Sequence, residues 1–129
     1  MISGIGIDST EIARFEPWAK KDRSELLKIL SEQEIDYCLD NPTKSAERFA
    51  ARFATKEAFF KAFRHIASES NIPFLAICRA IWLESAEGKP PKLNVDWNKL
   101  SVENPPKAWV SITHTDTTAT AMMVLESAQ

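Results

Sequence analysis

The chain is poor in residues and patterns that mark several classes of protein. It has two cysteines, Cys38 and Cys78, without the C-x-x-C spacing of a zinc or redox site. No run approaches the roughly 18 consecutive apolar residues of a membrane span, and the chain does not begin with a basic region followed by an apolar stretch. We therefore expect no signal peptide, reduced thiols and a cytoplasmic location.

Positive charge is not in excess either. The 16 Lys and Arg residues are outnumbered by 18 Asp and Glu residues, which gives a net charge of -2. Binding to a nucleic-acid backbone usually needs a surplus of Lys and Arg. We therefore expect no nucleic acid as the main ligand, and any basic surface must be local.

The apolar content is sufficient for one core. Hydrophobic residues make up 44% and charged residues 26% of the 129 residues, a size that leaves no room for a second core. We expect a single domain over residues 1–129. The predicted order of strand, helices and two hairpins indicates an α+β fold, with an antiparallel sheet packed against a long central helix and shorter helices.

The opening stretch MISGIGIDSTEI alternates as a strand does. Ile5 and Ile7 share one face, and Gly4, Gly6 and Asp8 share the other. Two of the three glycines in the chain are here. Glycine inside a strand commonly allows another backbone or a ligand to approach closely, so the glycine face is expected to meet one of them.

Three helical segments are expected next. The first covers residues 10–18, and the second covers KKDRSELLKIL, residues 20–30, with its three leucines facing inward. Ser31 and Glu34 have the spacing of a capping box, in which each side chain binds the other residue's free amide. A third helix should therefore begin at Ser31 and end near residue 40.

A long helix is predicted from Thr43 to about His65, because this segment contains neither Gly nor Pro. On a helical wheel three phenylalanines fall within about 40° of one another and form the expected core stripe. A basic stripe repeats every fourth residue along a neighbouring face. The core stripe is Phe49, Phe53 and Phe60, and the basic stripe is Lys44, Arg48, Arg52 and Lys56.

The last third of the chain predicts two hairpins. FLAICRAIWLE, residues 74–84, is rich in bulky and β-prone residues, SAEGKPP is a turn cluster, and KLNV, residues 92–95, is a short second strand. AWVSITHT and TATAMMVLE form a closing hairpin that turns at Asp116 and Thr117.

The position of Glu57 needs an explanation, because this carboxylate lies beside the apolar core stripe of a helix that is rich in basic residues. Its simplest interpretation is a salt bridge with Lys61, four residues later. The alternative is that the long helix crosses the sheet and brings Glu57 to Asp8. Two adjacent carboxylates repel unless a cation lies between them, and Mg²⁺ is commonly held by one or two carboxylates plus phosphates. Asp8 could instead cap the following helix.

Other candidates also have two interpretations. Gly88 and Lys89 could present amides and an ammonium to an anion, or simply form a hairpin turn. His114, next to an apolar strand face, is either a packed, hydrogen-bonded residue or a catalytic one. No Ser-His-Asp or Cys-His order, Walker-type loop or zinc spacing stands out. A magnesium site with phosphate-binding cations is therefore the most specific hypothesis from the residues alone.

Four motifs together resemble one known family. GIGIDSTEIARF (4–15), RFATKEAFFKAF (52–63), GKP (88–90) and VSITHT (110–115) are similar, in order and spacing, to the holo-acyl-carrier-protein synthase family of 4'-phosphopantetheinyl transferases. The resemblance covers essentially the whole chain. Members of that family move phosphopantetheine from coenzyme A to a serine of an acyl carrier protein, releasing adenosine 3',5'-bisphosphate, and they form trimers with sites between subunits.

The resemblance implies roles for particular residues. Asp8 and Glu57 would hold Mg²⁺ with the coenzyme A pyrophosphate and waters, and Lys61 would contact the reacting phosphate or assist proton transfer. Positioning and charge neutralisation drive most of such a reaction, so no protein nucleophile is needed. The base is left open between a metal-bound water, Glu57 and another acidic group. The implied nucleotide-binding residues are Lys44, Arg52, Gly88, Lys89, Pro90, Thr113, His114 and Thr115.

Carrier proteins of this kind are acidic, so a basic surface would steer them to the site. The resemblance implies that Arg14 docks the carrier, helped by Lys21 and Arg23. An ordinary solvated charge is the alternative for Arg14. One motif departs from the family pattern, because Arg64 and His65 replace the usual glycine turn after KAF. That departure motivates a second hypothesis, a non-catalytic paralogue that only binds the carrier or coenzyme A.

Overall fold

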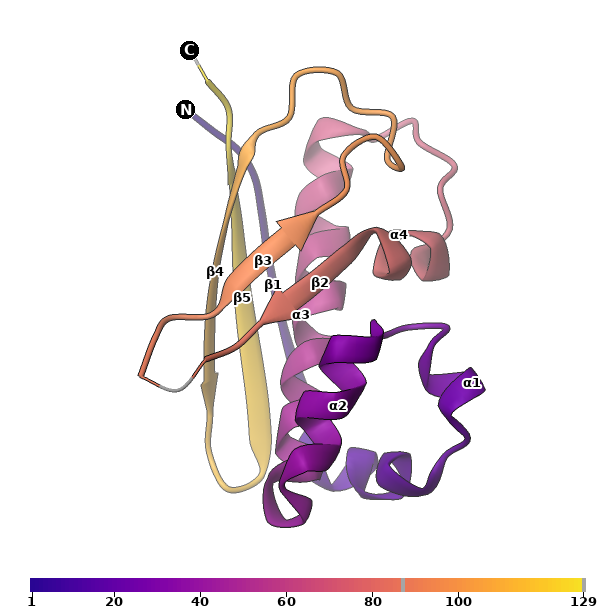
Figure 1. The fold of residues 1–129 in the computed structure, drawn as a ribbon. Helices are drawn as coiled ribbons and strands as arrows, with labels where there is room; N and C mark the ends of the chain where they lie inside the picture. The colour runs from indigo at the N-terminus through magenta and orange to yellow at the C-terminus, as the bar shows by residue number, and fades with distance from the viewer. Residues whose placement is uncertain (87, 129) are drawn as a thin grey trace.

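The computed structural model describes residues 1–86 and 88–128. Its elements follow the expected order, with one long helix in the middle of the chain (Figure 1). Glu87, in the predicted turn, lies outside the described residues. In chain order the elements are β1 (Ile2–Glu11), the 3-10 helix η1 (Ile12–Lys20), α1 (Arg23–Leu26), α2 (Glu32–Asp40), the 3-10 helix η2 (Pro42–Lys44), α3 (Ser45–Ile66), α4 (Phe74–Ala80), β2 (Ile81–Glu84), β3 (Lys92–Val95), β4 (Lys107–His114) and β5 (Thr118–Glu126).

The strands form two antiparallel sheets. β5 lies between β1 and β4 in a three-stranded sheet, while β2 and β3 pair separately. Both predicted hairpins and the α+β fold class are thereby confirmed. The two ends of the chain lie side by side (Figure 1), and the Ser127 amide donates to the Met1 carbonyl at 2.8 Å.

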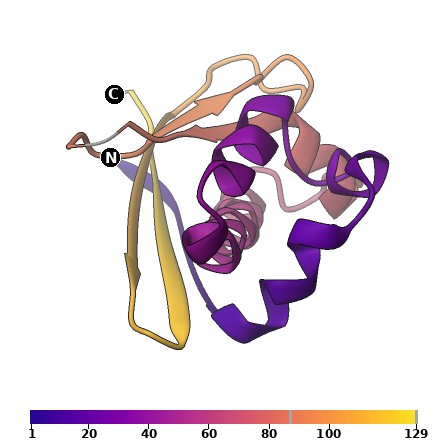
Figure 2. The ribbon, with the colours of Figure 1, turned by 60° about the horizontal axis from the view of Figure 1, so that its bottom comes forward.

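Helix α3 runs through the centre of the molecule. Figure 2 looks almost along it, with the three-stranded sheet on one side and the segments from η1 to α2 around the other. Phe49, Phe59 and Phe63 are buried, whereas Phe53 and Phe60 are only partly buried. The predicted phenylalanine stripe was therefore incomplete, because a helix covered on several sides buries residues outside a single stripe.

The glycines of β1 let α3 approach the sheet very closely. A Cβ on Gly6 would lie 2.0 Å from the Ala58 carbonyl oxygen, and a Cβ on Gly4 would lie 2.4 Å from that of Ala62. No side chain fits at these distances. The prediction that another backbone approaches the glycine face is confirmed, and that backbone belongs to α3.

The capping box at the start of α2 is confirmed. The Glu34 amide donates to Ser31 Oγ at 3.2 Å, and the Ser31 amide donates to Glu34 Oε1 at 2.9 Å. The helix ends at Asp40, as predicted.

Residues 74–84 are not one strand, because their first part folds as α4. The amides of Ala76 and Ile77 donate to the Pro73 carbonyl and begin the helix. Ile77 and Ala80, three residues apart, are buried on its inner side. The strand prediction was wrong for Phe74–Ala80, because bulky residues suit either a strand or a buried helix and packing decides between them.

The segment after β1 is less helical than predicted. β1 continues through Glu11, η1 is a 3-10 helix that contains Pro17, and α1 has only four residues. Leu26 and Leu30 are buried as expected, but Leu27 is 36% exposed. The prediction for Leu27 was wrong, because so short a helix does not hold one inward face through residue 30.

The face of the three-stranded sheet opposite α3, called here the outer sheet face, carries exposed apolar residues. Ile5 and Trp109 lie in one cross-strand row on either side of Val124, and Ile7 is opposite Met122 in the next row. Their exposed fractions are 53% for Ile5, 58% for Ile7, 50% for Trp109 and 43% for Met122. Contiguous apolar surface of this kind marks an interaction site. Within residues 1–86 and 88–128, no helix combines the length and apolar character needed to cross a membrane.

Candidate active site

Asp8 and Glu57 come together where α3 crosses β1, and Lys61 joins them. The Lys61 ammonium donates to the Ile7 carbonyl at 2.9 Å and to Asp8 Oδ1 at 3.3 Å. The Asp8 side chain is 18% exposed, while that of Lys61 is 51% exposed. This group of three residues, called here the acidic cluster, is therefore open to solvent on the lysine side.

The electrostatics of the acidic cluster favour an added cation. Partial burial and the negative charge of Asp8 raise the pKa of Glu57 above its ordinary value, and the positive charges of Lys61 and Arg14 offset part of that rise. Two carboxylates in one partly buried place repel each other. A cation between them would relieve that repulsion.

The two simpler interpretations of these carboxylates do not hold. Among the ion pairs of the described residues there is none between Glu57 and Lys61, because Lys61 reaches across to β1 instead. Glu11, not Asp8, occupies the N-cap of η1, and no side-chain hydrogen bond caps that helix. Asp8 is thus free of a capping role and faces α3.

The acidic cluster fits magnesium as a partial ligand set. No group of three or more His, Cys, Asp or Glu residues suited to a metal occurs in the part of the chain that the structure describes. Two carboxylates alone do not fill the octahedral shell of Mg²⁺, which commonly keeps waters and takes further oxygens from bound phosphates. The donor set therefore suits a metal that arrives with a phosphate ligand.

A second feature, called here the cationic pocket, lies on the other side of α3. It is a hollow of about 250 Å³ beside the larger groove of about 550 Å³ that runs along β2 and the turn after it. The pocket gathers basic side chains from four separate segments, which suits a ligand with several negative charges. Those basic residues are Lys44, Arg48, Arg52, Lys89 and His114.

Tyr37 of α2 holds two of these arginines. The Arg48 and Arg52 guanidinium carbons lie 3.9 and 4.4 Å from the centre of its ring. Arg52 is 2% exposed and donates to Ser85 Oγ at 2.9 Å, but its Nε has no hydrogen-bond partner among the described residues. Burial lowers the pKa of Arg52 from its ordinary value. A bound anion would supply the missing acceptor.

His114 enters the cationic pocket from the end of β4. Its Nε2 lies 2.9 Å from Glu47 Oε1 of α3, and its side chain is half exposed. Thr113 points to the other face of the strand, since strand side chains alternate, and Thr115 accepts from the amides of Thr117 and Thr118 in the turn. The structure therefore brings His114 to the pocket within one chain, but not Thr113 or Thr115.

The predicted GKP residues lie in the turn between β2 and β3. Gly88 adopts φ +75° with nothing within 4 Å of a Cβ placed there. Lys89 lines both the cationic pocket and the groove, and Pro90 lines the groove. The turn interpretation is correct, and the same turn also borders the hollow.

The acidic cluster and the cationic pocket are separated within one chain. Asp8 and Ile112, which lines the pocket, are both cross-strand neighbours of Ala121. Their strands are thus about 10 Å apart, two strand spacings. Helix α3 packs on β1 and β5 between them, and with side chains it is about 10 Å wide. One ligand could not occupy both features of the same chain without passing over the helix.

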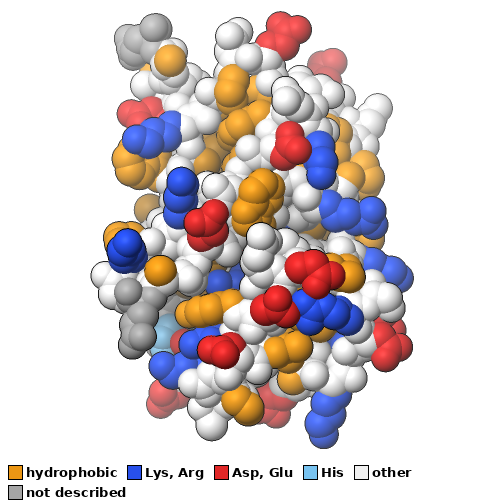
Figure 3. All heavy atoms as spheres, in the orientation of Figure 1, with side chains coloured by type: hydrophobic (Ala, Val, Ile, Leu, Met, Phe, Trp, Pro, Cys, Tyr) orange, Lys and Arg blue, Asp and Glu red, His pale blue; other side chains and the backbone are white. Residues whose placement is uncertain are grey.

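The three predicted docking residues differ in whether their charges are already paired with acidic side chains. Arg14 donates to Thr10 Oγ1 at 3.4 Å and lies over the Phe15 and Phe53 rings, close enough for its charge to affect Glu57. Lys21 is 3.7 Å from Glu25. Arg23 binds Glu32 and Asp36. On the face shown in Figure 3, basic and acidic side chains are intermixed over α1 and α2.

Two further sequence features have clear positions. Helix α3 continues through Arg64 and His65 to Ile66, as the missing glycine turn suggested. His65 lines a shallow hollow with Lys61 and Ile7, and the Arg64 guanidinium lies over the Phe60 ring. Both cysteines are buried, which raises the pKa of each thiol to about 12 and leaves them unsuited to nucleophilic chemistry.

Sequence reasoning missed several residues of the site. It did not single out Tyr37 or Glu47, because contacts between α2, α3 and β4 leave no regular spacing in one segment. It also placed Lys56 on the basic stripe, whereas Lys56 is 1% exposed and paired with Glu34. The cationic pocket is therefore lined by the other three members of that stripe but not by Lys56.

Fold and site together define a small α+β protein with paired carboxylates and a separate cationic pocket, an arrangement suited to a phosphate-bearing ligand. The chain belongs to the 4'-phosphopantetheinyl transferase superfamily, whose family model matches residues 4–120. The family expected from the four motifs is confirmed.

Relatives and solved structures agree with this assignment over nearly the whole chain. The holo-[acyl-carrier-protein] synthase of Enterococcus faecalis is 36% identical over 128 residues, which cover 98% of this chain and 99% of that protein. The synthase of Bacillus subtilis is 34% identical, with coverage of 98% and 97%. The crystal structure of a holo-(acyl-carrier-protein) synthase from Bacillus anthracis in complex with CoA (3',5'-ADP) is 29% identical, with a TM-score of 0.75 and 99% of each chain covered.

Proposed function

We propose that the protein is a magnesium-dependent holo-[acyl-carrier-protein] synthase. It transfers 4'-phosphopantetheine from coenzyme A to a serine of an apo-acyl carrier protein that is used in fatty acid biosynthesis. The observation that carries the proposal is the convergence of Asp8, Glu57 and Lys61 at the crossing of β1 and α3. The names of the relatives point to the same reaction, and two buried, unpaired thiols suit a cytoplasmic location.

The residues divide the work of this transfer. The serine hydroxyl loses its proton to a general base, its oxygen forms a bond to the β-phosphorus of coenzyme A, the bond from that phosphorus to the bridging pyrophosphate oxygen breaks, and adenosine 3',5'-bisphosphate leaves. Asp8 and Glu57 would hold the metal, and Lys61 would neutralise charge on the reacting phosphate. When bound, Mg²⁺ would supply charge stabilisation to the pyrophosphate. Lys44, Arg52, Lys89 and His114 would bind the nucleotide phosphates.

We propose that each complete site lies between two subunits of a homotrimer. Within one chain, α3 separates the acidic cluster from the cationic pocket. One coenzyme A molecule would therefore contact the acidic cluster of one chain and the cationic pocket of another. The outer sheet face provides a surface for such contacts, because Ile5, Ile7, Trp109 and Met122 are exposed together.

The transfer itself tests the function. Purified protein, Mg²⁺, coenzyme A and apo-carrier should give a carrier heavier by the mass of phosphopantetheine in an intact-protein mass spectrum. Chelation of the metal, Asp8→Asn and Glu57→Gln should each abolish the product, whereas Glu69→Gln, an exposed acid beyond the end of α3, should not. Wild-type protein that leaves the carrier unmodified under these conditions would refute the proposal.

A non-catalytic binder is the second candidate, and the extension of α3 through Arg64 and His65 favours it. It predicts that coenzyme A or the carrier binds without transfer, and that Arg64→Gly, which restores a glycine at this end of the helix, permits transfer. If the wild-type protein is active and Arg64→Gly has the same turnover, the reason for this candidate disappears.

A further inference from the structure

Among the described residues, the most deeply buried charges lie outside the acidic cluster and the cationic pocket. Lys56 and Glu34 have side chains that are 1% and 0% exposed, and Lys56 Nζ lies 2.8 Å from Glu34 Oε1. The same ammonium donates to the carbonyls of Cys78 and Ile81, each at 2.9 Å. All three of its hydrogens are therefore used.

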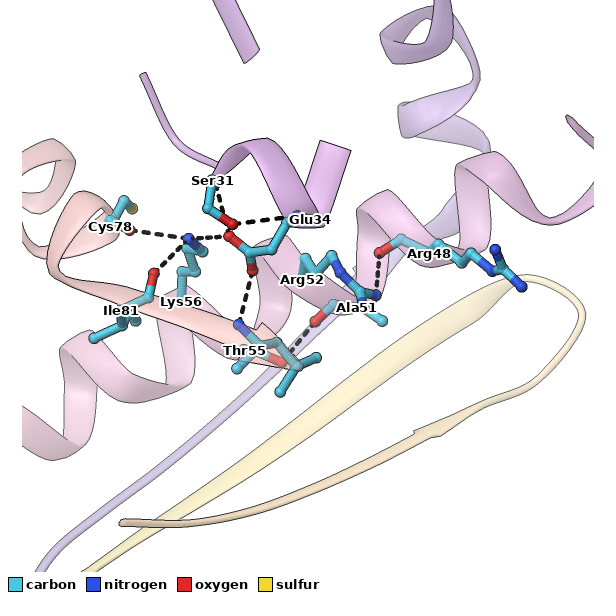
Figure 4. Close-up of polar contacts among 10 residues, drawn as sticks. Ser31, Glu34, Arg48, Ala51, Arg52, Thr55, Lys56, Cys78 and Ile81 are labelled. Atoms are coloured by element: carbon cyan, nitrogen blue, oxygen red, sulfur yellow. Dashed lines mark hydrogen bonds and ion pairs between the residues drawn. The ribbon is translucent and has the colours of Figure 1, made fainter. Parts of the chain in front are cut away.

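Glu34 is equally well satisfied. Oε1 accepts from the Ser31 amide as well as from Lys56, and Oε2 accepts from the Leu83 amide at 3.0 Å. Figure 4 shows these contacts converging from α2, α3, the end of α4 and β2. One buried ion pair thus joins α2 and α3 to α4 and β2, which follow later in the chain.

The contacts on β2 have a regular pattern. Lys56 binds the carbonyl of Ile81, Glu34 binds the amide of Leu83, and Arg52, one turn before Lys56 on α3, binds the hydroxyl of Ser85. Residues 81, 83 and 85 are alternate positions along one extended segment. The segment is therefore fixed at three successive points along its length.

This anchored segment leads directly into the nucleotide-binding features. Leu83 and Ser85 line both the cationic pocket and the adjacent groove, and the turn that carries Lys89 follows them. The pair also adjoins the acidic cluster in sequence, because Lys56 precedes Glu57. Successive helical residues point about 100° apart, so Lys56 turns toward β2 while Glu57 turns toward Asp8.

We propose that Glu34 and Lys56 are positioning residues, which hold β2 and its turn in the register that the nucleotide phosphates require. The inference rests on the proposed function, since it assigns the pair a part in binding coenzyme A. The two residues do not touch the ligand. They act through the backbone of Ile81 and Leu83, and their removal should weaken coenzyme A binding without changing the chemical step.

An apolar replacement separates positioning from simple stability. Exchange of a buried ion pair for apolar residues of similar volume is often neutral or stabilising, whereas loss of one partner leaves an unpaired buried charge. The double variant Glu34→Leu/Lys56→Met should therefore stay folded, yet it offers no acceptor to the Leu83 amide and no donor to the Ile81 carbonyl. Thr55→Val is the matched control, because Thr55 is buried on the same helix and its hydroxyl binds only the Ala51 carbonyl within that helix.

The experiment compares wild type, the double variant and Thr55→Val by thermal melting, by transfer kinetics at saturating apo-carrier, and by hydrogen exchange at the Leu83 amide. We expect the double variant to raise the KM for coenzyme A about tenfold, with kcat within about twofold of wild type. Exchange at Leu83 should also accelerate. Thr55→Val should match wild type in all three measurements.

A folded double variant with the wild-type KM for coenzyme A would overturn the inference. If the double variant does not fold, Glu34→Gln/Lys56→Met decides in its place, because it leaves no unpaired charge and its amide carbonyl still accepts from Ser31, while its NH₂ group cannot accept from Leu83. A KM for Glu34→Gln/Lys56→Met equal to that of Thr55→Val would again overturn it. Absence of transfer by the wild type would refute the proposed function instead, so the two failures are distinct.

Discussion

Replacement of Gly6 by alanine should separate α3 from β1. The new Cβ would lie 2.0 Å from the Ala58 carbonyl oxygen and 2.9 Å from the Ala62 nitrogen, whereas ordinary contacts begin at 3.4 Å. Both neighbours are backbone atoms, so no side chain can rotate away. Helix and strand must therefore part by about 1.4 Å at this point.

The expected cost exceeds that of an ordinary overpacked core. Overpacking typically costs about 1–3 kcal/mol where side chains can adjust, and here they cannot, so we expect about 3–5 kcal/mol of the roughly 5–15 kcal/mol that stabilises a domain. For a chain of this size that corresponds to a melting temperature lower by roughly 10–20 °C. The same displacement draws Glu57 and Lys61 away from Asp8, and a misplacement of about 1 Å can reduce a rate about 100-fold.

Chemical denaturation and the transfer assay test this prediction together. Gly88→Ala is the matched control for stability, because Gly88 has φ +75° but nothing within 4 Å of its Cβ position. It should lose only about 1–2 kcal/mol, the conformational cost of a left-handed residue. If Gly6→Ala loses no more than Gly88→Ala, the close approach of α3 is not what requires glycine in β1.

Three further predictions concern charge and assembly. The pKa of Glu57 is raised in the folded protein, so protonated Glu57 stabilises the fold below the ordinary carboxyl pKa, and this stabilisation is lost as the pH rises through the raised value. Without metal, Glu57→Gln should therefore raise the melting temperature at pH 8 and not at pH 4. Ile5→Asp, at an exposed position of the outer sheet face, should dissociate the proposed trimer in sedimentation velocity while circular dichroism stays unchanged. Arg14→Ala should raise the KM for the carrier more than Arg23→Ala, because Arg23 is bound to Glu32 and Asp36; equal effects would count against docking at Arg14.

The acidic cluster was largely predictable because its causes are local. Gly4 and Gly6 on one face of a strand indicate an approaching backbone, and Asp8 lies on the same face, so it meets the same neighbour. The wheel placed Glu57 beside the core stripe, where a helix that crosses the sheet would bring it to Asp8, but the same position also allowed a salt bridge with Lys61. The capping box at Ser31 was predictable for the same reason, since its partners are three residues apart.

The cationic pocket was not predictable from the residues alone. It combines Tyr37, Arg52, Lys89 and His114 from four separate segments. Only the family resemblance indicated that the segments of Arg52, Lys89 and His114 meet, and nothing indicated Tyr37. The periodicity of α3 was equally uninformative about Lys56. A basic residue at every fourth position looks like a solvated stripe, and nothing in the local sequence shows that two of its members, Arg52 and Lys56, will be buried.

Helix α3 makes the two features of the site depend on each other. Lys56 and Arg52 bind the segment that leads to the turn carrying Lys89, while Glu57 and Lys61 face β1 from the other side of α3. The distance from α3 to β1 is set by Ala58 and Ala62 against the glycines. A shift of this helix would therefore move the acidic cluster and the cationic pocket at once. Because Ala58 and Ala62 are themselves fully buried, we expect Ala58→Leu and Ala62→Leu to overpack the core, displace the helix and lower both the melting temperature and the transfer rate.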